Sequence, residues 1–154
     1  MRINFIWIGK PKHDYVASGI STYHKRLSRY CTTKIIQLKD VRATNSADQM
    51  HKEAQLFRKH MDNKSFNVFL DERGKRFSSI EFSNFISQLQ NRSTKQLNMI
   101  IGGAYGFEDN FLSKSDFRLS LSRMTLPHDL CRLVLLEQVY RAFTLLNNEK
   151  YHHN

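Results

Sequence analysis

Cysteine and proline are scarce in this sequence, with only two of each among 154 residues. Cys31 and Cys131 stand far apart and lack the paired spacing of a zinc site or a disulfide framework. The sequence therefore excludes both and favours a reducing compartment. The composition shows no signature of disorder, and the length indicates one folded domain spanning residues 1–154.

Long hydrophobic runs are also absent. No stretch reaches the roughly 20 apolar residues that a membrane-spanning helix needs. The apolar run at residues 3–9 is too short for a signal peptide, and no small-residue cleavage site follows it. We therefore expect a cytoplasmic protein that has no membrane partner.

Acidic residues are few relative to basic ones. The 24 lysines and arginines outnumber 14 aspartates and glutamates, which gives a formal net charge of +10. Such an excess predicts an anionic partner. Nucleic acid is favoured over a membrane surface because no amphipathic basic helix stands out. A generally basic, solvated surface is the alternative.

Apolar bursts alternate with helical patterns along the chain, which predicts an α/β fold with a largely parallel sheet flanked by helices. Ser78 or Ser79, followed by Glu81, is typical of a capped helix start. The segment 71–77, around Gly74, is expected to be a turn. The expected strands are 3–9, 34–41, 66–71, 97–103 and 117–122, and the expected helices are 14–30, 46–61, 78–92 and 128–149.

The last expected helix is unusually apolar. Of its 17 residues from 130 to 146, 12 are Leu, Val, Cys, Ala, Phe or Tyr, and they surround the helix instead of forming one stripe. One sheet cannot cover them all. Either the second apolar face is buried by another copy of the chain, or the helix is sandwiched within one chain.

Three glycines follow the fourth expected strand in the segment "IIGGAYG". Gly102, Gly103 and Gly106 do not have the spacing of a dinucleotide fingerprint, and no Gly-Lys-Ser/Thr of a phosphate-binding loop follows them. Phosphate binding is therefore disfavoured. A ligand without phosphate and close packing between chain segments remain equally supported.

A second informative segment is "SLSRMTLPHDLCRLVLLEQVYRAF", residues 120–143. Residues 122–126 form a short loop before Pro127, a residue that favours the start of a helix. Free peptide groups beside the apolar Met124 and Leu126 suit an adenine ring. An ordinary strand-to-helix connection is the alternative.

These segments, in this order and with "YH" near the end, closely resemble the bacterial 23S rRNA pseudouridine-N3 methyltransferases of the SPOUT class. "IWIGKPKHDYVASGISTYHKRL" and "FLDERGKRFSSIEFSNFI" match as well, so the resemblance covers essentially the whole chain. It implies an α/β-knot fold with a C-terminal trefoil knot, a homodimer, and S-adenosylmethionine bound by three loops. The residues that the resemblance assigns to the methyl donor are Leu70, Gly102, Gly103, Leu121, Ser122, Arg123, Met124, Thr125 and Leu126.

The reaction implied by the resemblance is methylation of N3 of pseudouridine 1915 in 23S rRNA, without a metal. A SPOUT enzyme that acts on tRNA and a non-catalytic ribosome-binding protein of the same fold are the alternatives. The donor carries a positive sulfonium, so backbone and apolar walls suit it better than lysines or arginines. We expect Gly102 and Gly103 to let the main chain approach the nucleoside where a Cβ would intrude.

The candidate catalytic residues are His128, Arg141, Tyr151 and His152. In a dimer joined by the last helix, the tail of one chain would reach the pocket of the other. There Tyr151 would stack on a base, and His152 would contact phosphate or accept a proton. A structural hydrogen bond at a helix start is the alternative for His128, and a frayed terminus is the alternative for the tail.

Overall fold

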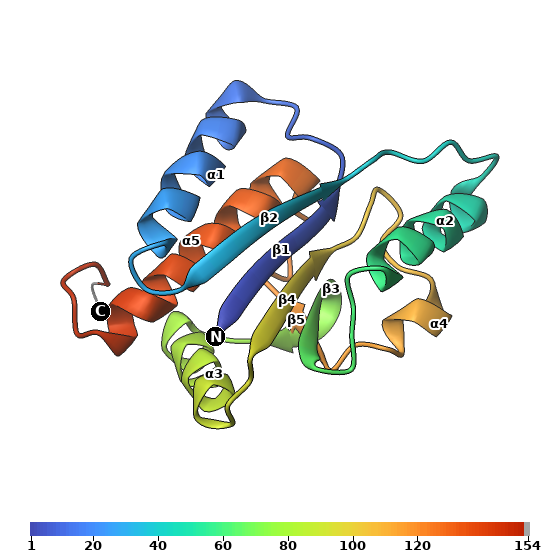
Figure 1. Ribbon diagram of the computed structural model, residues 1–154. Helices are drawn as coiled ribbons and strands as arrows, with labels where there is room; N and C mark the ends of the chain where they lie inside the picture. The colour runs from blue at the N-terminus through green and yellow to red at the C-terminus, as the bar shows by residue number, and fades with distance from the viewer. Residues whose placement is uncertain (153–154) are drawn as a thin grey trace.

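Strands and helices alternate along the chain in the computed structural model, which describes residues 1–152 (Figure 1). The elements are β1 (Arg2–Ile8), α1 (Asp14–Leu27), β2 (Thr32–Leu38), α2 (Ser46–Arg58), β3 (Ser65–Arg76), α3 (Ser79–Asn91), β4 (Gln96–Ile101), α4 (Asp109–Leu112), β5 (Phe117–Ser120) and α5 (His128–Leu146). Among these residues, no helix is both long and apolar enough to cross a membrane.

The five strands form one parallel sheet in the order β2-β1-β4-β3-β5. The predicted α/β class, with a largely parallel sheet flanked by helices, is thus confirmed. β1 lies inside the sheet between β2 and β4, and every residue of β1 after Arg2 is buried. A buried strand that is apolar except at Asn4 is what helices on both faces of a parallel sheet require.

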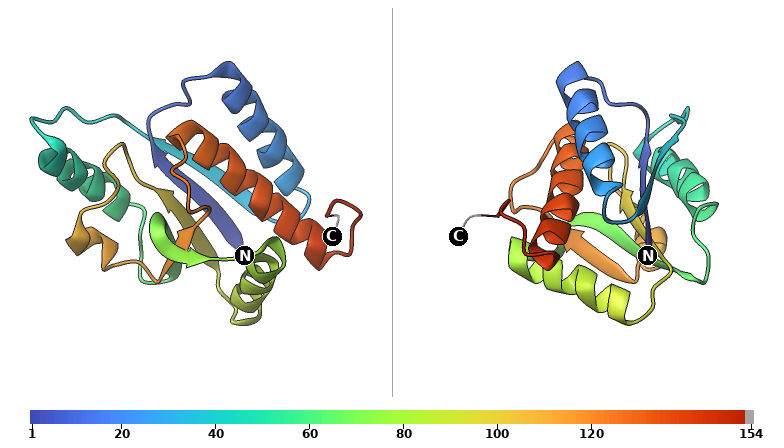
Figure 2. Two further views of the ribbon diagram at one scale, coloured as in Figure 1. Left: turned by 180° about the vertical axis from the view of Figure 1, so that it is seen from behind. Right: turned by 60° about the vertical axis from the view of Figure 1, so that its left-hand side comes forward.

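Helices cover both faces of the sheet, and alternate residues of β1 face them. Ile3, Phe5 and Trp7 belong to the large core beneath α1, α3 and α5. Ile6 and Ile8 point the other way, into a smaller core with α2 and α4. The two views in Figure 2 separate these helix layers on either side of the strands. The two-residue period of a strand therefore divides the apolar residues between two cores.

A row of buried asparagines crosses the three inner strands at one level. Asn4 of β1 pairs in register with Asn98 of β4, and Asn98 pairs with Asn67 of β3. The Asn98 side chain accepts a hydrogen bond from Asn4 at 2.9 Å and donates one to Asn67 at 2.9 Å. It also donates to the carbonyl of His60 at 3.1 Å. Because buried amides require partners, this row favours one strand register over its neighbours.

The turn predicted for residues 71–77 is wrong, because β3 continues through it as far as Arg76. The pairing of β3 with β5 shifts register between Leu70 and Lys75. A Cβ on Gly74 would lie 2.7 Å from the backbone of Arg118, so this glycine permits the close approach of β5. The short helix α4 was not predicted either.

The last helix, α5, packs between α1 and α3 on one face of the sheet (Figure 2). Leu133 lies against Gly19 of α1, so part of the second apolar face is covered within the chain. A stripe on the side away from the sheet remains only half-buried. We call Leu130, Val134, Glu137, Arg141 and Leu145 the outer stripe of α5.

We predict that Asn98→Ala lowers the free energy of unfolding by about 2–4 kcal/mol, because it leaves the buried amides of Asn4 and Asn67 without their shared partner. Chemical denaturation followed by circular dichroism measures the change. Asn110→Ala, at an exposed position, is the control and should shift the value by less than about 0.5 kcal/mol. Equal effects of the two substitutions would contradict a structural role for the asparagine row.

Candidate functional site

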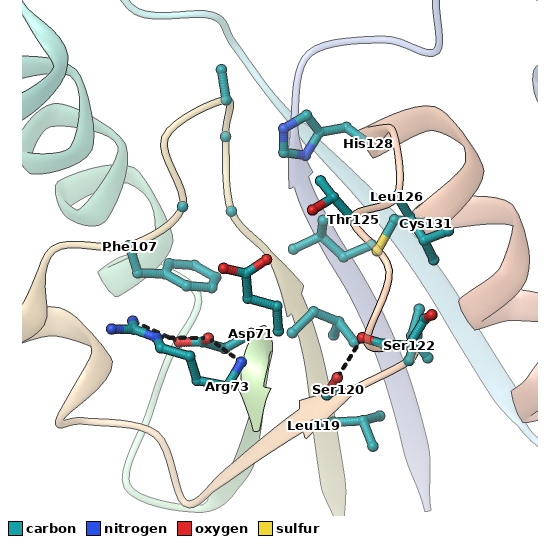
Figure 3. Close-up of a pocket in the computed structure, with 18 of the residues that line it drawn as sticks. Asp71, Arg73, Phe107, Leu119, Ser120, Ser122, Thr125, Leu126, His128 and Cys131 are labelled. Atoms are coloured by element: carbon teal, nitrogen blue, oxygen red, sulfur yellow. Dashed lines mark hydrogen bonds and ion pairs between the residues drawn. The ribbon is translucent and has the colours of Figure 1, made fainter. Parts of the chain in front are cut away.

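A cavity of about 470 Å³ opens where β3, β4 and β5 reach their carboxyl-terminal regions (Figure 3). Three chain segments line it, together with His128 and Cys131 at the start of α5. The segments are 70–73 of β3, 101–107 after β4, and 119–126 after β5 with the exception of Arg123. Open α/β sheets commonly bind ligands at this edge.

The glycine segment after β4 forms a tight turn at the cavity wall. The Gly106 N–H donates to the Gly103 carbonyl at 3.0 Å, and the two residues form an isolated bridge. Gly106 has φ of +74°, a backbone conformation that glycine adopts without strain. Behind the turn, the Phe107 ring packs 4.8 Å from the ring of Phe69, which anchors the segment to the smaller core.

The missing Cβ atoms of the two adjacent glycines face other parts of the chain. A Cβ on Gly102 would lie 3.1 Å from the backbone of Gly106. One on Gly103 would overlap the carboxylate of Glu53. The expectation that these glycines make room for a ligand therefore needs correction, because the space they leave is filled by the turn itself and by α2. Their contribution to the cavity is the shape of the turn.

Glu53 is a buried carboxyl directly behind this turn, and the sequence patterns did not identify it. Its side chain accepts a hydrogen bond from Gln49 at 2.9 Å, while its second oxygen has no partner among the described residues. Desolvation by burial raises the pKa of Glu53, against the effects of the Gln49 hydrogen bond and the nearby Gly103 N–H. Burial of a glutamate at this point indicates that it supports the glycine turn.

The segment after β5 is held by two serine hydroxyls. Ser120 donates to the carbonyl of Ser122 at 2.9 Å, and the Ser122 hydroxyl accepts the N–H of Met124 at 2.9 Å. This arrangement holds Met124 in an exposed position, with 76% of its surface accessible. Tyr105 on the facing segment is 58% exposed. Two large exposed apolar side chains beside one cavity are typical of a binding site.

The third wall, from β3, carries charged residues that the sequence patterns did not assign to the site. Leu70 is the one residue of this wall that was expected, and Asp71, Glu72 and Arg73 follow it. Arg73 donates two hydrogen bonds to Asp71, from Nε to Oδ1 at 3.1 Å and from Nη2 to Oδ2 at 3.0 Å. Burial acts to raise the pKa of Asp71, but the hydrogen bonds from Arg73 lower it overall. Asp71 is therefore ionised and paired.

His128 is the first residue of α5, and its imidazole lies at the cavity (Figure 3). Desolvation, followed by the nearby charge of Arg132, lowers the pKa of His128 below its ordinary value. The imidazole is therefore neutral at pH 7 and can accept a proton. Burial also raises the pKa of the neighbouring Cys131 thiol to about 11, so this thiol stays protonated.

The other three candidate catalytic residues gather at the far end of α5. The Tyr151 hydroxyl lies 3.1 Å from Glu137 Oε1 and 3.2 Å from the Tyr23 hydroxyl. The Arg141 guanidinium lies 4.8 Å from the centre of the Tyr151 ring, and its Nη1 lies 3.3 Å from His152 Nδ1. At the rise of an α-helix, Arg141 lies about 20 Å along the axis from His128. One chain therefore does not bring Arg141, Tyr151 and His152 to its own cavity.

Comparison with known proteins places the whole described chain in a single family. The family described as "Predicted SPOUT methyltransferase" matches residues 1–152. A protein of Geobacter sp. (strain M21) named ribosomal RNA large subunit methyltransferase H is 39% identical over 153 residues, 99% of each chain. A protein of Clostridium tetani (strain Massachusetts / E88) with the same name is 39% identical over 158 aligned residues, again 99% of each.

One solved structure shows the same fold at low sequence identity. It is a probable methylase family protein from Haemophilus influenzae Rd KW20, and it superposes with a TM-score of 0.58 at 13% identity. The match covers 99% of this chain and 70% of that one.

We predict that Gly103→Ala lowers the free energy of unfolding by about 1–3 kcal/mol, because the added methyl group overlaps the Glu53 carboxylate. The same substitution in a Glu53→Ala background should cost about 1 kcal/mol less, since the side chain that it meets is gone. Chemical denaturation of the four proteins in this double-mutant cycle measures the coupling. Strictly additive effects would show that the turn does not rest on Glu53.

Proposed function

The chain belongs to the SPOUT methyltransferase family, and we propose that this methyltransferase transfers the methyl group of S-adenosylmethionine to N3 of pseudouridine 1915 in 23S rRNA. The names of its relatives and its net charge of +10 support an rRNA substrate. The observation that carries the proposal is the cavity between three chain segments at the edge of the sheet, one from β3 and two after β4 and β5. We also propose that the protein is cytoplasmic and that its C-terminal half forms a trefoil knot.

The lining of the cavity fits the donor. Leu121, Leu126 and Met124 provide apolar surface, and the turn at Gly102–Gly106 and the loop at 119–126 provide peptide groups for an adenine edge. Lysine is absent from the described lining, and its one arginine, Arg73, is paired with Asp71. Bound S-adenosylmethionine would supply a methyl group activated by its positively charged sulfur, which this lining does not repel. The donor residues proposed here are Leu70, Gly102, Gly103, Leu121, Ser122, Met124, Thr125 and Leu126; Arg123, which was also expected, is exposed and lies outside the lining.

Two tasks remain for the protein in this reaction. It must hold N3 in line with the methyl group, and positioning of this kind can supply most of the acceleration. It must also let the N3 proton leave, for which a general base adds about 10²–10⁴-fold. His128, neutral at pH 7 and beside the cavity, suits the role of proton acceptor.

A second copy of the chain would place the tail residues at the cavity. The outer stripe of α5 is half-buried in one chain and carries Leu130, Val134 and Leu145, which suits a two-fold contact between identical helices. Arg141, Tyr151 and His152 lie at one end of this helix, and the cavity lies at the other. Antiparallel pairing of two such helices would bring each tail to the cavity of its partner. We therefore propose a homodimer with shared sites.

Exposed basic and aromatic side chains support contact with RNA. Lys25 and Arg26 are exposed on α1, and Arg29 is exposed in the turn that follows it; all three suit phosphate groups, which position RNA without reading its sequence. Tyr105 at the cavity is exposed and suits stacking on an unpaired base.

We predict that the protein transfers labelled methyl groups from S-adenosylmethionine to 23S rRNA when it is incubated with ribosomes lacking this modification. Nuclease mapping should place the label on N3 of pseudouridine 1915. Purified tRNA is tested in parallel. Labelling of tRNA but not of ribosomes would show that tRNA, and not 23S rRNA, is the substrate. Binding to ribosomes without any transfer would favour a non-catalytic ribosome-binding protein.

We predict that a heterodimer with two different defects keeps about half of the wild-type activity, because one of its two shared sites is intact. One chain carries Gly102→Val, which distorts the turn at the cavity, and the other carries Tyr151→Ala with His152→Ala. Co-expression with two affinity tags isolates the heterodimer, and each variant homodimer is the inactive control. Complete inactivity of the heterodimer would show that tail and cavity act within one chain.

A further inference from the structure

The cavity wall formed by β3 is acidic in a protein that is strongly basic. Among the described lining residues, Asp71, Glu72 and Arg73 are the ones charged at pH 7, because the pKa of His128 is lowered. Two carboxylates and one guanidinium leave this wall with a net charge of −1, whereas the whole chain has +10. This contrast suggests that the negative charge of the wall interacts with a positively charged group of the ligand.

Asp71 does not supply this unbalanced charge. Its side chain is only 7% exposed, and Arg73 contacts both of its oxygens. The Arg73 N–H also donates to Asp71 Oδ1, at 2.9 Å. The two side chains, joined by dashed lines in Figure 3, therefore form a closed pair whose charges cancel.

Glu72 supplies the unbalanced charge. It lies between the two paired residues in the chain and lines the same cavity. Its side chain makes no hydrogen bond and no ion pair with any residue from 1 to 152, and the residue is exposed. Its charge raises the pKa of Arg73 only as the smallest of several causes. The Glu72 carboxylate is thus free to act on a molecule in the cavity.

The methyl donor and its product differ in charge at one atom. In S-adenosylmethionine the sulfur is a sulfonium with a positive charge. Loss of the methyl group converts it to the neutral thioether of S-adenosylhomocysteine, while the adenosine, amino and carboxylate groups are unchanged. A carboxylate near this atom lowers the free energy of the bound donor and has little effect on the bound product.

We propose that Glu72 sets the preference of the cavity for the cationic donor over its neutral thioether product. The inference rests on the proposed use of S-adenosylmethionine and adds a residue that determines specificity. Because Glu72 is exposed, its interaction is screened by water and salt and amounts to a factor of about three to five in affinity. A preference of this size lets fresh donor displace the product after each turnover.

Isothermal titration calorimetry with S-adenosylmethionine and S-adenosylhomocysteine tests the proposal on the wild-type protein and on Glu72→Gln. The glutamine keeps the size of the side chain and removes its charge. The variant should bind the donor about three- to fivefold more weakly and the product with unchanged affinity. Asp62→Asn is the matched control, because Asp62 precedes β3 at the opposite edge of the sheet and its Oδ1 acceptor is retained.

Salt provides a second measurement. Raising the ionic strength should weaken donor binding more than product binding in the wild-type protein, and this difference should shrink in Glu72→Gln. Sinefungin, which carries a protonated amine in place of the methylated sulfur, should follow the donor in every protein.

The outcomes separate the two proposals. Equal losses for donor and product in Glu72→Gln, or no loss for either, would overturn the role of Glu72 while the donor site stands. The same selective loss in Asp62→Asn would also overturn it, because net charge would then be the cause. Failure of the wild-type protein to bind either compound would overturn the proposed function, and the role of Glu72 with it.

Discussion

The register of the three inner strands determines where the functional residues of this protein lie. Asn4, Asn98 and Asn67 meet at one level of the sheet and share hydrogen bonds that a slipped register would break. With this register fixed, residues 70–73 of β3 and the segments that follow β4 and β5 meet at one edge of the sheet. The cavity is a consequence of that alignment, since each strand supplies one of its walls.

The walls of the cavity are shaped by contacts between chain segments. Side chains do not fit at positions 102 and 103, because Gly106 and Glu53 occupy the space that they would need. The turn they form presents peptide groups and apolar surface, and the one arginine of the lining is neutralised by Asp71. A cavity of this kind suits a cation that carries no phosphate. The close packing that requires glycine in this turn therefore also gives the proposed donor site its uncharged wall of peptide groups.

The helix α5 connects two groups of candidate residues that it also keeps apart. His128 lies at its first turn beside the cavity, and Arg141 lies near its last turn with Tyr151 and His152. A packed helix cannot fold back to join its own ends. Under the proposed dimer, the half-buried outer stripe of α5 is the contact through which a second copy would complete the site. The opposite side of the helix packs in the large core of its own chain.

The sequence by itself determined the order and type of the main elements, and its motifs marked all three segments around the cavity, the first of them through Leu70 alone. The apolar run at residues 3–9 predicts a buried strand, which the structure has as β1, and Ser78 with Glu81 forms the capping box at the start of α3. These features depend on neighbours in the chain, so patterns reveal them. The resemblance to a methyltransferase family, now confirmed over residues 1–152, came from motifs in the same way.

Only the tertiary structure decided which distant residues meet. Glu53 lies behind a turn fifty positions later in the chain, and no local pattern marks a glutamate that will be buried. The extension of β3 through Gly74 depends on the approach of β5, and the isolated charge of Glu72 depends on Arg73 pairing with Asp71. The burial of a residue, its partners and the net charge around it depend on every chain segment that lies near it. A linear sequence contains those segments but not their distances.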